Sequence, residues 1–315
     1  MITRGLQACI VLAFTLTATL AFGTQAHAQA PDSVRLMRTI GILAHDSMEG
    51  RATGTAGSIK AQKFLEAEFA KRGLKPFLAG KYSEAFKLRG SRTAPNDSVS
   101  ARNIAGVIRG MKNTGKYIVV SAHYDHLGMR NGSVFNGADD NASGTAAILE
   151  VASWFADHEP AHNILIVAFD AEERGDAGSH AFLAMHKAFA DSVLIDINLD
   201  MVGRNVGNEL YAAGTTPYPF LLTYVQTAAA RAGLKLLTGH DNKGGGQDDW
   251  TNQSDHGAFH ALGIPYIYFG EEDHPDYHRA TDEIAGIMPG FYVNAVRVVL
   301  DVVRQIDAKP FVRVK

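Results

Sequence analysis

Apolar residues recur along this chain with two different periods, which alternate from residue 103 onward. Short apolar runs predict strands at residues 104–108, 117–122, 163–169, 194–199 and 265–269. Helical spacing predicts helices at residues 144–155, 177–189 and 219–230, and a long C-terminal helix marked by Phe291, Ala295, Val299, Val302 and Ile306. Strands that alternate with helices predict an α/β fold with a mixed, mostly parallel central sheet and helices on both faces.

The pattern before residue 101 is different. Residues 30–76 have helical spacing that ends near Gly73 and Pro76, while residues 77–100 are polar and predict a linker. We therefore expect a helical lead-in and linker at residues 29–100 and an α/β core at residues 101–308. The polar segment 109–116 predicts a hairpin turn between the first two strands of the core.

The first residues predict an export signal. Arg4 precedes an apolar run at residues 9–22, and Ala26-His27-Ala28 matches the A-x-A cleavage pattern. The run is shorter than the ~20 residues that a membrane span needs. We therefore expect residues 1–28 to be a signal peptide, and the mature protein to be secreted or periplasmic with no membrane attachment. Cleavage removes Cys9, the only cysteine, so thiol and disulfide chemistry are excluded.

Composition narrows the class further. The chain has 315 residues, of which 46% are hydrophobic and 20% charged, as in ordinary globular proteins. Its net charge of −3 argues against a basic nucleic-acid-binding protein, so no nucleic-acid partner is expected.

Histidines and acids follow the predicted strands in short segments. These segments contain His123-Tyr-Asp125, Asp139-Asp140 before a helix, Glu172-Glu173, Asp200 and, much later, His278. Sites in open α/β sheets form beyond the carboxyl ends of the strands, so we expect these side chains to meet there. Carboxylates gathered in that way repel one another unless cations neutralise them, and two divalent ions would do so.

Imidazole and carboxylate ligands together favour zinc, and manganese and cobalt accept the same ligands. His123 and Asp125 point the same way in an extended segment, so the acid is placed to orient the histidine. Of the neighbours Glu172 and Glu173, one can ligate while the other acts as a base on a water molecule.

One competing metal motif is rejected. His158-Glu-Pro-Ala-His162 matches the H-E-x-x-H pattern of single-zinc proteases, but that pattern requires a continuous helix. Pro160 lies between the two histidines and disfavours a helix there, so we expect a connecting loop.

Taken together, the segments resemble those of the family-28 metallopeptidases, di-zinc exopeptidases that include secreted bacterial leucine aminopeptidases. The shared pattern is His-x-Asp, then Gly-Ala-x-Asp-x-x-Ser-Gly, then Glu-Glu, then Asp after a strand, then a late His, and it covers residues 103–282. The lead-in at residues 43–55 is also similar to that of bacterial members. Larger members carry an inserted protease-associated domain, for which residues 77–100 are too short, so a single peptidase domain at residues 29–315 is expected.

The resemblance implies a role for each matching residue. The ligands of two Zn²⁺ ions would be His123, Asp140, Glu173, Asp200 and His278, with Asp140 bridging both ions. Asp125 would orient His123, and Glu172 would be the general base. The implied activity is an aminopeptidase that attacks peptide substrates with a hydroxide held between the two ions.

Alternatives within the same fold stay open at this point. A carboxypeptidase or dipeptidase would need a basic residue for the substrate carboxylate, and Arg174, Arg204 and Arg279 flank the motifs. An aminopeptidase needs an acid for the substrate ammonium group, such as Asp249 or Asp255. The oxyanion donor could be Tyr268, Tyr277 or His256. A glutaminyl cyclase is less favoured because the Asp-Asn-Ala-Ser-Gly signature is kept, and a non-catalytic relative because no ligand is missing.

Overall fold

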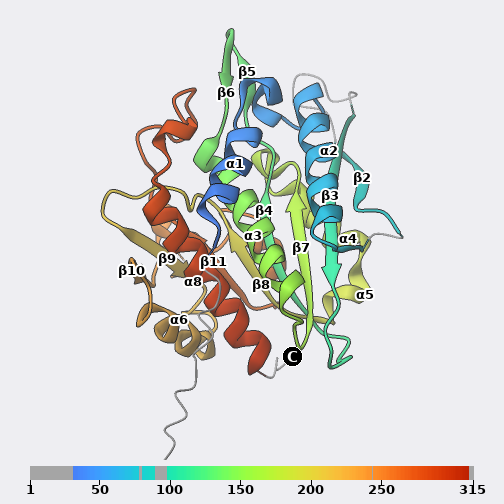
Figure 1. Ribbon diagram of the computed structural model, residues 1–315, viewed down its shortest axis with the longest axis vertical. Coiled ribbons are helices and arrows are strands. Elements are labelled where there is room, and N and C mark those ends of the chain that lie inside the picture. The colour runs from blue at the N-terminus through green and yellow to red at the C-terminus, as the bar shows by residue number, and fades with distance from the viewer. Residues whose placement is uncertain (1–30, 78–79, 89–97, 243, 312–315) are drawn as a thin grey trace, which may run out of the picture. The chain divides into compact units, whose positions relative to one another are not determined.

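Four apolar runs form the centre of the sheet in a computed structural model, which describes residues 31–77, 80–88, 98–242 and 244–311. They are β4 (Tyr117–His123), β7 (Asn163–Phe169), β8 (Val193–Leu199) and β11 (Tyr266–Gly270). These strands lie in the order β7-β4-β8-β11 and pair in parallel, with Val119 opposite Leu165 on one side and Asp196 on the other. All four therefore end at the same edge of the sheet (Figure 1).

Antiparallel strands extend this parallel centre on both sides. On one side, β3 (Val99–Ile108) pairs with β7, and β1 (Lys75–Pro76) and β2 (Ser83–Leu88) pair with β3. On the other side, β9 (Glu209–Ala213) pairs with β11, and β10 (Lys235–Leu237) runs parallel to β9. A separate hairpin of β5 (Gly128–Arg130) and β6 (Ser133–Phe135) projects at the top of Figure 1. The sheet is mixed with a parallel centre, as predicted.

Helices cover both faces of the sheet because alternate residues of the central strands point to opposite sides. One face packs against α1 (Ser33–Leu43), α2 (Ala56–Lys71), α3 (Gly144–Asp157), α6 (Leu222–Ala229) and α8 (Pro289–Ala308). The other face packs against α4 (Ala177–Met185), α5 (Lys187–Ala190) and α7 (His256–His260). Ile118 and Val120 belong to the first core and Val119 to the second, so the predicted three-layer arrangement is confirmed.

Three local expectations are wrong in part. Residues 77–100 contain strand β2, whose Phe86 is buried with Ala101. Segment 109–116 is not a hairpin, because β7 lies between β3 and β4 in the sheet. The helix expected at residues 177–189 divides into α4 and α5 at His186, which has non-helical dihedral angles (φ −117°, ψ 43°).

The lead-in is likewise two helices and not one, since α1 and α2 are separated by residues 44–55. The described residues from Pro31 onward group into one compact unit. The predicted signal peptide at residues 1–28 lies outside the described residues. Within the described residues, no helix combines the length and the apolar character needed to cross a bilayer.

One carboxyl group in the centre of the sheet predicts a measurable pH effect. Asp196 of β8 is fully buried, accepts a hydrogen bond of 2.8 Å from Ser121 Oγ, and has a pKa raised by burial to about 8. Its pKa is higher in the folded than in the unfolded chain, so stability falls as the pH rises from about 4 to about 8. We expect Asp196→Asn, which keeps the acceptor oxygen, to raise the Tm relative to wild type by a margin that grows up to about pH 8.

Thermal unfolding at several pH values between 5.5 and 9 measures this margin, with Asp157→Asn at an exposed position as the control. A margin for Asp196→Asn that does not change with pH would contradict the prediction.

Candidate metal centre

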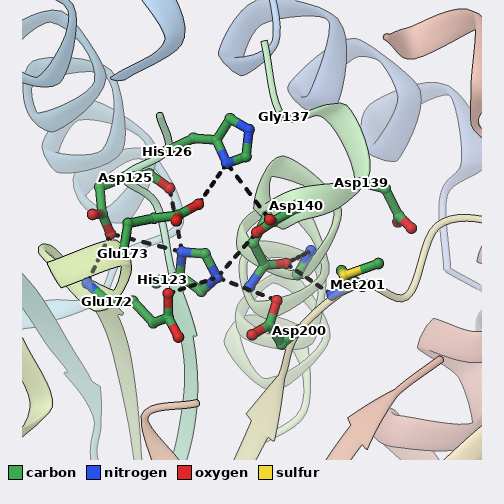
Figure 2. A network of polar contacts seen from close by, with 12 residues as sticks. His123, Asp125, His126, Gly137, Asp139, Asp140, Glu172, Glu173, Asp200 and Met201 are labelled. Atoms are coloured by element: carbon green, nitrogen blue, oxygen red, sulfur yellow. Dashed lines mark hydrogen bonds and ion pairs between the residues drawn. The ribbon is translucent and has the colours of Figure 1, made fainter. Parts of the chain in front are cut away.

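The sequence-predicted side chains meet at the carboxyl edge of the parallel strands. His123 is the last residue of β4, Asp200 directly follows β8, and Glu172 and Glu173 follow β7 after a two-residue turn. Asp140 lies in the loop that opens α3. Figure 2 shows these five side chains converging from separate elements. The shared direction of the parallel strands is what brings residues together that are up to 77 positions apart.

Asp140 lies between two groups of side chains. Its Oδ1 is 3.4 Å from His123 Nε2, and that nitrogen is 3.2 Å from Asp200 Oδ1. Its Oδ2 is 3.2 Å from His278 Nε2, which is in turn 3.4 Å from Glu173 Oε2. The structure thus brings together all five residues predicted as ligands, with one oxygen of Asp140 facing each group.

The charges of this cluster fit divalent cations. Burial raises the pKa of Asp140, which is 3% exposed, so its negative charge is costly without a positive partner. Burial would lower the pKa of His278, but its hydrogen bonds with Asp140 and Glu173 raise it to about 10. The surroundings therefore hold a proton firmly on His278. A field that holds a proton in this way also attracts a metal ion, and imidazole with carboxylate oxygens is a donor set that zinc accepts.

The two adjacent glutamates face different groups. Glu173 contacts His278 on the Asp140 side, whereas Glu172 Oε2 lies 4.0 Å from His123 Nε2 on the Asp200 side. Burial raises the pKa of Glu172 well above its usual value. His123, Glu172 and Asp200 offer ligand atoms within 4.8 Å of one another, so Glu172 is near a metal position but lies outside the Asp140 contacts.

Asp125 supports His123 from the opposite side of the ring. The Asp125 carboxylate Oδ1 is 3.7 Å from His123 Nδ1, and the same oxygen accepts a hydrogen bond of 3.1 Å from the backbone N–H of Glu172. Its Oδ2 accepts a hydrogen bond of 3.1 Å from Thr53 Oγ1. His123 Nδ1 lies closer to the Asp125 backbone carbonyl oxygen, at 3.2 Å, so the Asp125 segment joins His123 to the Glu172 loop.

Sequence reasoning gave no role to His126. Its ring is buried, and Nδ1 lies 2.8 Å from Glu173 Oε1 and 3.6 Å from Asp140 Oδ2. His126, Asp140 and Glu173 form a second group with metal-ligand spacing. The signal that could have indicated it is its position in the same segment as His123 and Asp125.

A third group, Asp139 with Glu271 and His274, also has metal-ligand spacing. One hydrogen bond argues against His274 as a ligand there. His274 Nδ1 accepts from the backbone N–H of Asp276 at 3.2 Å, which leaves the ring proton on Nε2, 3.3 Å from Asp139 Oδ2. Figure 2 shows Asp139 pointing away from the main cluster. This group therefore joins the late loop to the loop that carries Asp140.

The rejected H-E-x-x-H motif, residues 158–162, lies in a connecting loop, as expected. His158 stacks on Trp154 at a ring distance of 4.1 Å, and His162 Nδ1 lies 3.1 Å from Asp307 Oδ1. Among the described residues, neither histidine belongs to a candidate metal group. Residues 158–162 connect α3 to β7, so the absence of a helix is what separates the two histidines.

A pocket of about 590 Å³ opens over the cluster. Beyond the predicted ligands, its walls carry the aromatic residues Trp250, Tyr268 and Tyr277 and the acids Asp248, Glu271, Glu272 and Asp273. No lysine or arginine is among the described residues that line it. The described lining is therefore both acidic and aromatic.

Several of the residues that the sequence offered for substrate binding or oxyanion stabilisation do not line the pocket. Of the three arginines, none lines the pocket, and Arg204 Nη1 is bonded to Asp276 at 2.7 Å. Asp249 and Asp255 do not line it either. Tyr268 and Tyr277 do, whereas His256 is buried with Nε2 2.9 Å from the Trp250 carbonyl oxygen.

Comparison with known proteins gives two kinds of match. The model described as Peptidase family M28 matches residues 103–303, more than half of the chain. A "Probable zinc metalloprotease" of Pyrenophora tritici-repentis is 27% identical over 204 residues, which are 63% of this chain and 45% of that protein. Aminopeptidase YwaD of Bacillus subtilis is 33% identical over 183 residues, 54% of this chain and 36% of that protein. The match spans less than half of the length of these curated relatives.

Solved structures match over nearly the whole fold. The zinc aminopeptidase BSAP of Bacillus subtilis has a TM-score of 0.71 at 19% identity, covering 87% of this chain and 95% of that one. A glutaminyl cyclase of Fimbriiglobus ruber has a TM-score of 0.71 at 22% identity, with the same coverage. These likenesses confirm the predicted fold class. The aminopeptidase and the glutaminyl cyclase share this fold, so the fold does not distinguish their two activities.

The contacts of Asp282 predict an effect on metal binding. Its carboxylate accepts hydrogen bonds from the backbone N–H groups of Asp139 (3.0 and 3.1 Å) and Asp140 (3.0 Å). We expect Asp282→Asn to weaken Zn²⁺ binding by about 10–100-fold, because the loop that presents Asp140 loses an anchor. Competition with a chromophoric chelator measures the affinity.

A matched control is Asp241→Asn, because Asp241 is also buried and also accepts two backbone N–H bonds, from Gly214 and Thr216, at another place in the fold. The control should lower stability without changing Zn²⁺ affinity. Equal affinity losses in both variants would show that the effect is general and not local to the centre.

Proposed function

The chain belongs to peptidase family M28, and from this premise we propose that it is a di-zinc aminopeptidase that removes N-terminal residues from peptides. The observation that carries the proposal is Asp140, whose two oxygens each face a separate group of ligand-type side chains. A carboxylate in this position is suited to bridge two ions, and such pairs are typical of hydrolytic two-metal sites.

The residues of the centre divide into two ligand sets under this proposal. His123 and Asp200 would hold one ion, Glu173 and His278 the other, and Asp140 both. Zinc bound there would polarise the scissile carbonyl and lower the pKa of coordinated water. Manganese or cobalt would accept the same donors.

Glu172 would act as the general base and then as the general acid. It would take a proton from the attacking water as the new C–O bond forms, and give that proton to the leaving amine nitrogen as the C–N bond breaks. Its burial and raised pKa support this role, because a base must also be able to release the proton. Tyr268 and Tyr277 line the pocket and are the candidate donors to the oxyanion.

The charge of the pocket supports recognition of a free amino terminus. The exposed acids Asp248, Glu272 and Asp273 lie on its rim, where they would attract the substrate ammonium group. A carboxypeptidase or dipeptidase would need a cation for the terminal carboxylate, and no lysine or arginine is among the described lining residues. The glutaminyl cyclase alternative is opposed by the Asp140-Asn-Ala-Ser-Gly144 signature.

Export of the enzyme is part of the same proposal. It rests on the signal-peptide pattern of residues 1–28, with Arg4, the apolar run and the Ala26-His27-Ala28 site. The working location would then be the periplasm or the medium, where peptides are available as substrates.

A substrate panel tests the direction of cleavage. We expect the Zn²⁺-loaded protein to hydrolyse aminoacyl anilides and peptides with a free amino terminus. N-acetylated peptides should not be cleaved, because they lack the cation that the acidic rim recognises. Chromatography of the products distinguishes the outcomes: release of C-terminal residues, or pyroglutamate formed from glutaminyl peptides, would overturn the proposal in favour of one of the two alternatives.

Glutamine variants of the two neighbouring glutamates serve as controls for each other. Glu172→Gln should keep both ions and lower kcat by at least about 10²-fold with little change in KM, because proton transfer is lost only in the transition state. Glu173→Gln should instead lose metal, because one ligand oxygen is replaced by an amide. Metal analysis and kinetics on both variants decide this: the reverse pattern would mean that the roles are exchanged, and less than about twofold changes in both would place neither residue in the reaction.

A further inference from the structure

Arg51 is a buried arginine whose role is not explained by the proposed reaction. It is fully shielded from solvent and is the largest of the completely buried side chains among the described residues. It comes from the lead-in, between α1 and α2, and not from the catalytic part of the sheet. Burying a guanidinium is unfavourable unless it is paired or fully hydrogen-bonded, so its partners require an explanation.

All four hydrogen bonds of the guanidinium go to backbone carbonyl oxygens. Nη1 donates to Leu43 at 2.7 Å and to Asn136 at 2.6 Å. Nε donates to Tyr124 at 2.7 Å, and Nη2 donates to Gly137 at 3.0 Å. Among the described residues no carboxylate forms an ion pair with Arg51, so its side chain acts as a connector of main-chain segments.

The segments that it connects are those that carry the predicted ligands. Tyr124 lies between His123 and Asp125, and Asn136 and Gly137 lead into the loop of Asp140. One rigid planar group therefore sets the separation between the His123 segment and the Asp140 loop. Lysine could not do this, because a single ammonium group cannot reach acceptors spread over a fork of three nitrogens.

A second contact from the same segment reaches the centre directly. Thr53 Oγ1 donates a hydrogen bond of 3.1 Å to Asp125 Oδ2, and Asp125 lies against the Nδ1 side of His123. Arg51 and Thr53 thus approach the centre by two routes, one through the main chain and one through a side chain.

The backbone of this segment is held in an uncommon conformation. Glu49, Gly50 and Arg51 all have positive φ, at 53°, 63° and 53°. A Cβ on Gly50 would lie 2.3 Å from the Phe135 carbonyl oxygen, so only glycine permits the close approach to the β5–β6 hairpin. Non-glycine residues in this region cost free energy and persist only where the surroundings hold them.

The charge of Arg51 is compensated by the centre itself. Burial lowers the pKa of Arg51 to about 10, while the negative charges of Asp140, Asp282, Asp125 and Glu173 act in the opposite direction. The guanidinium therefore stays charged at neutral pH and offsets part of the repulsion among these acids.

We propose that Arg51 and Thr53 are positioning residues of the metal centre, which hold the His123 segment and the Asp140 loop at the separation that lets both residues face the same ion. The proposal rests on the metal centre of the proposed function. It makes the lead-in a working part of that centre, and it predicts that metal affinity depends on residues at least 70 positions away from the ligands they support.

The test is Arg51→Lys, which keeps the charge but removes the fork. Zn²⁺ affinity, measured by chelator competition, should fall by about 10–100-fold, as for other residues that support ligands without touching the metal. The visible absorption spectrum of the Co²⁺-loaded protein should change, because the ligands around the ion are displaced. The increase in Tm on adding Zn²⁺ should be smaller than in wild type at the same metal concentration.

Arg72→Lys is the matched control. Arg72 is also buried, and its guanidinium also bonds to backbone carbonyls, those of Glu68 and Leu149, but it packs between α2 and α3 away from the ligands. This control should lower the Tm of the metal-free protein and leave the Zn²⁺ affinity and the Co²⁺ spectrum unchanged. If the role of Arg51 were merely structural, Arg51→Lys would give the same result as Arg72→Lys.

Thr53→Val keeps the test decisive if Arg51→Lys does not fold. It removes only the hydroxyl that Asp125 accepts from, and we expect Zn²⁺ affinity to fall by several-fold, with Thr55→Val, at the exposed N-cap of α2, as its control. The proposal is overturned if Arg51→Lys folds and has the Zn²⁺ affinity and Co²⁺ spectrum of wild type. If Arg51→Lys does not fold, the proposal is overturned when Thr53→Val has the Zn²⁺ affinity of wild type. If wild-type protein itself binds no metal, the proposed function fails instead, so the two failures are distinguishable.

Discussion

Repulsion among buried carboxylates is the constraint on which the rest of this structure depends. Asp140, Glu173 and Asp200 meet at the end of the parallel strands with little solvent to screen them. The histidines between them respond to this charge: hydrogen bonds with Asp140 and Glu173 raise the pKa of His278 to about 10, although burial would lower it. A fold that accepts this cost keeps a site in which divalent cations are the natural partners.

The loops around the centre are held mainly through the main chain. Asp282 accepts from the N–H groups of Asp139 and Asp140, while Arg51 donates to the carbonyl groups of Asn136 and Gly137. The same short loop is therefore fixed by an anion on its donors and by a cation on its acceptors. Because these contacts anchor the loop, the Asp140 side chain is not needed to hold it, and both of its oxygens face the ligand groups.

The pocket shows how one architecture can serve different chemistries. The likeness to both an aminopeptidase and a glutaminyl cyclase lies in the sheet and its helices, which do not choose between reactions. The features on which the proposed activity rests surround the centre: exposed acids, aromatic side chains, and no basic residue among the described lining. Those features follow from the late loops, which contribute Trp250, Glu272 and Tyr277.

The sequence by itself determined the strands, the alternation with helices and the ligand-type residues that end each strand, such as His123 and Asp200, because these signals are local and periodic. Only the tertiary structure decided that β2 joins the sheet, that His126 contacts Glu173, and that Arg51 supports the Asp140 loop. The physical reason is that these contacts join segments far apart in the chain, mostly through backbone atoms that every residue carries. Backbone contacts such as those of β2 and Arg51 leave no pattern in the side chains from which they could have been predicted.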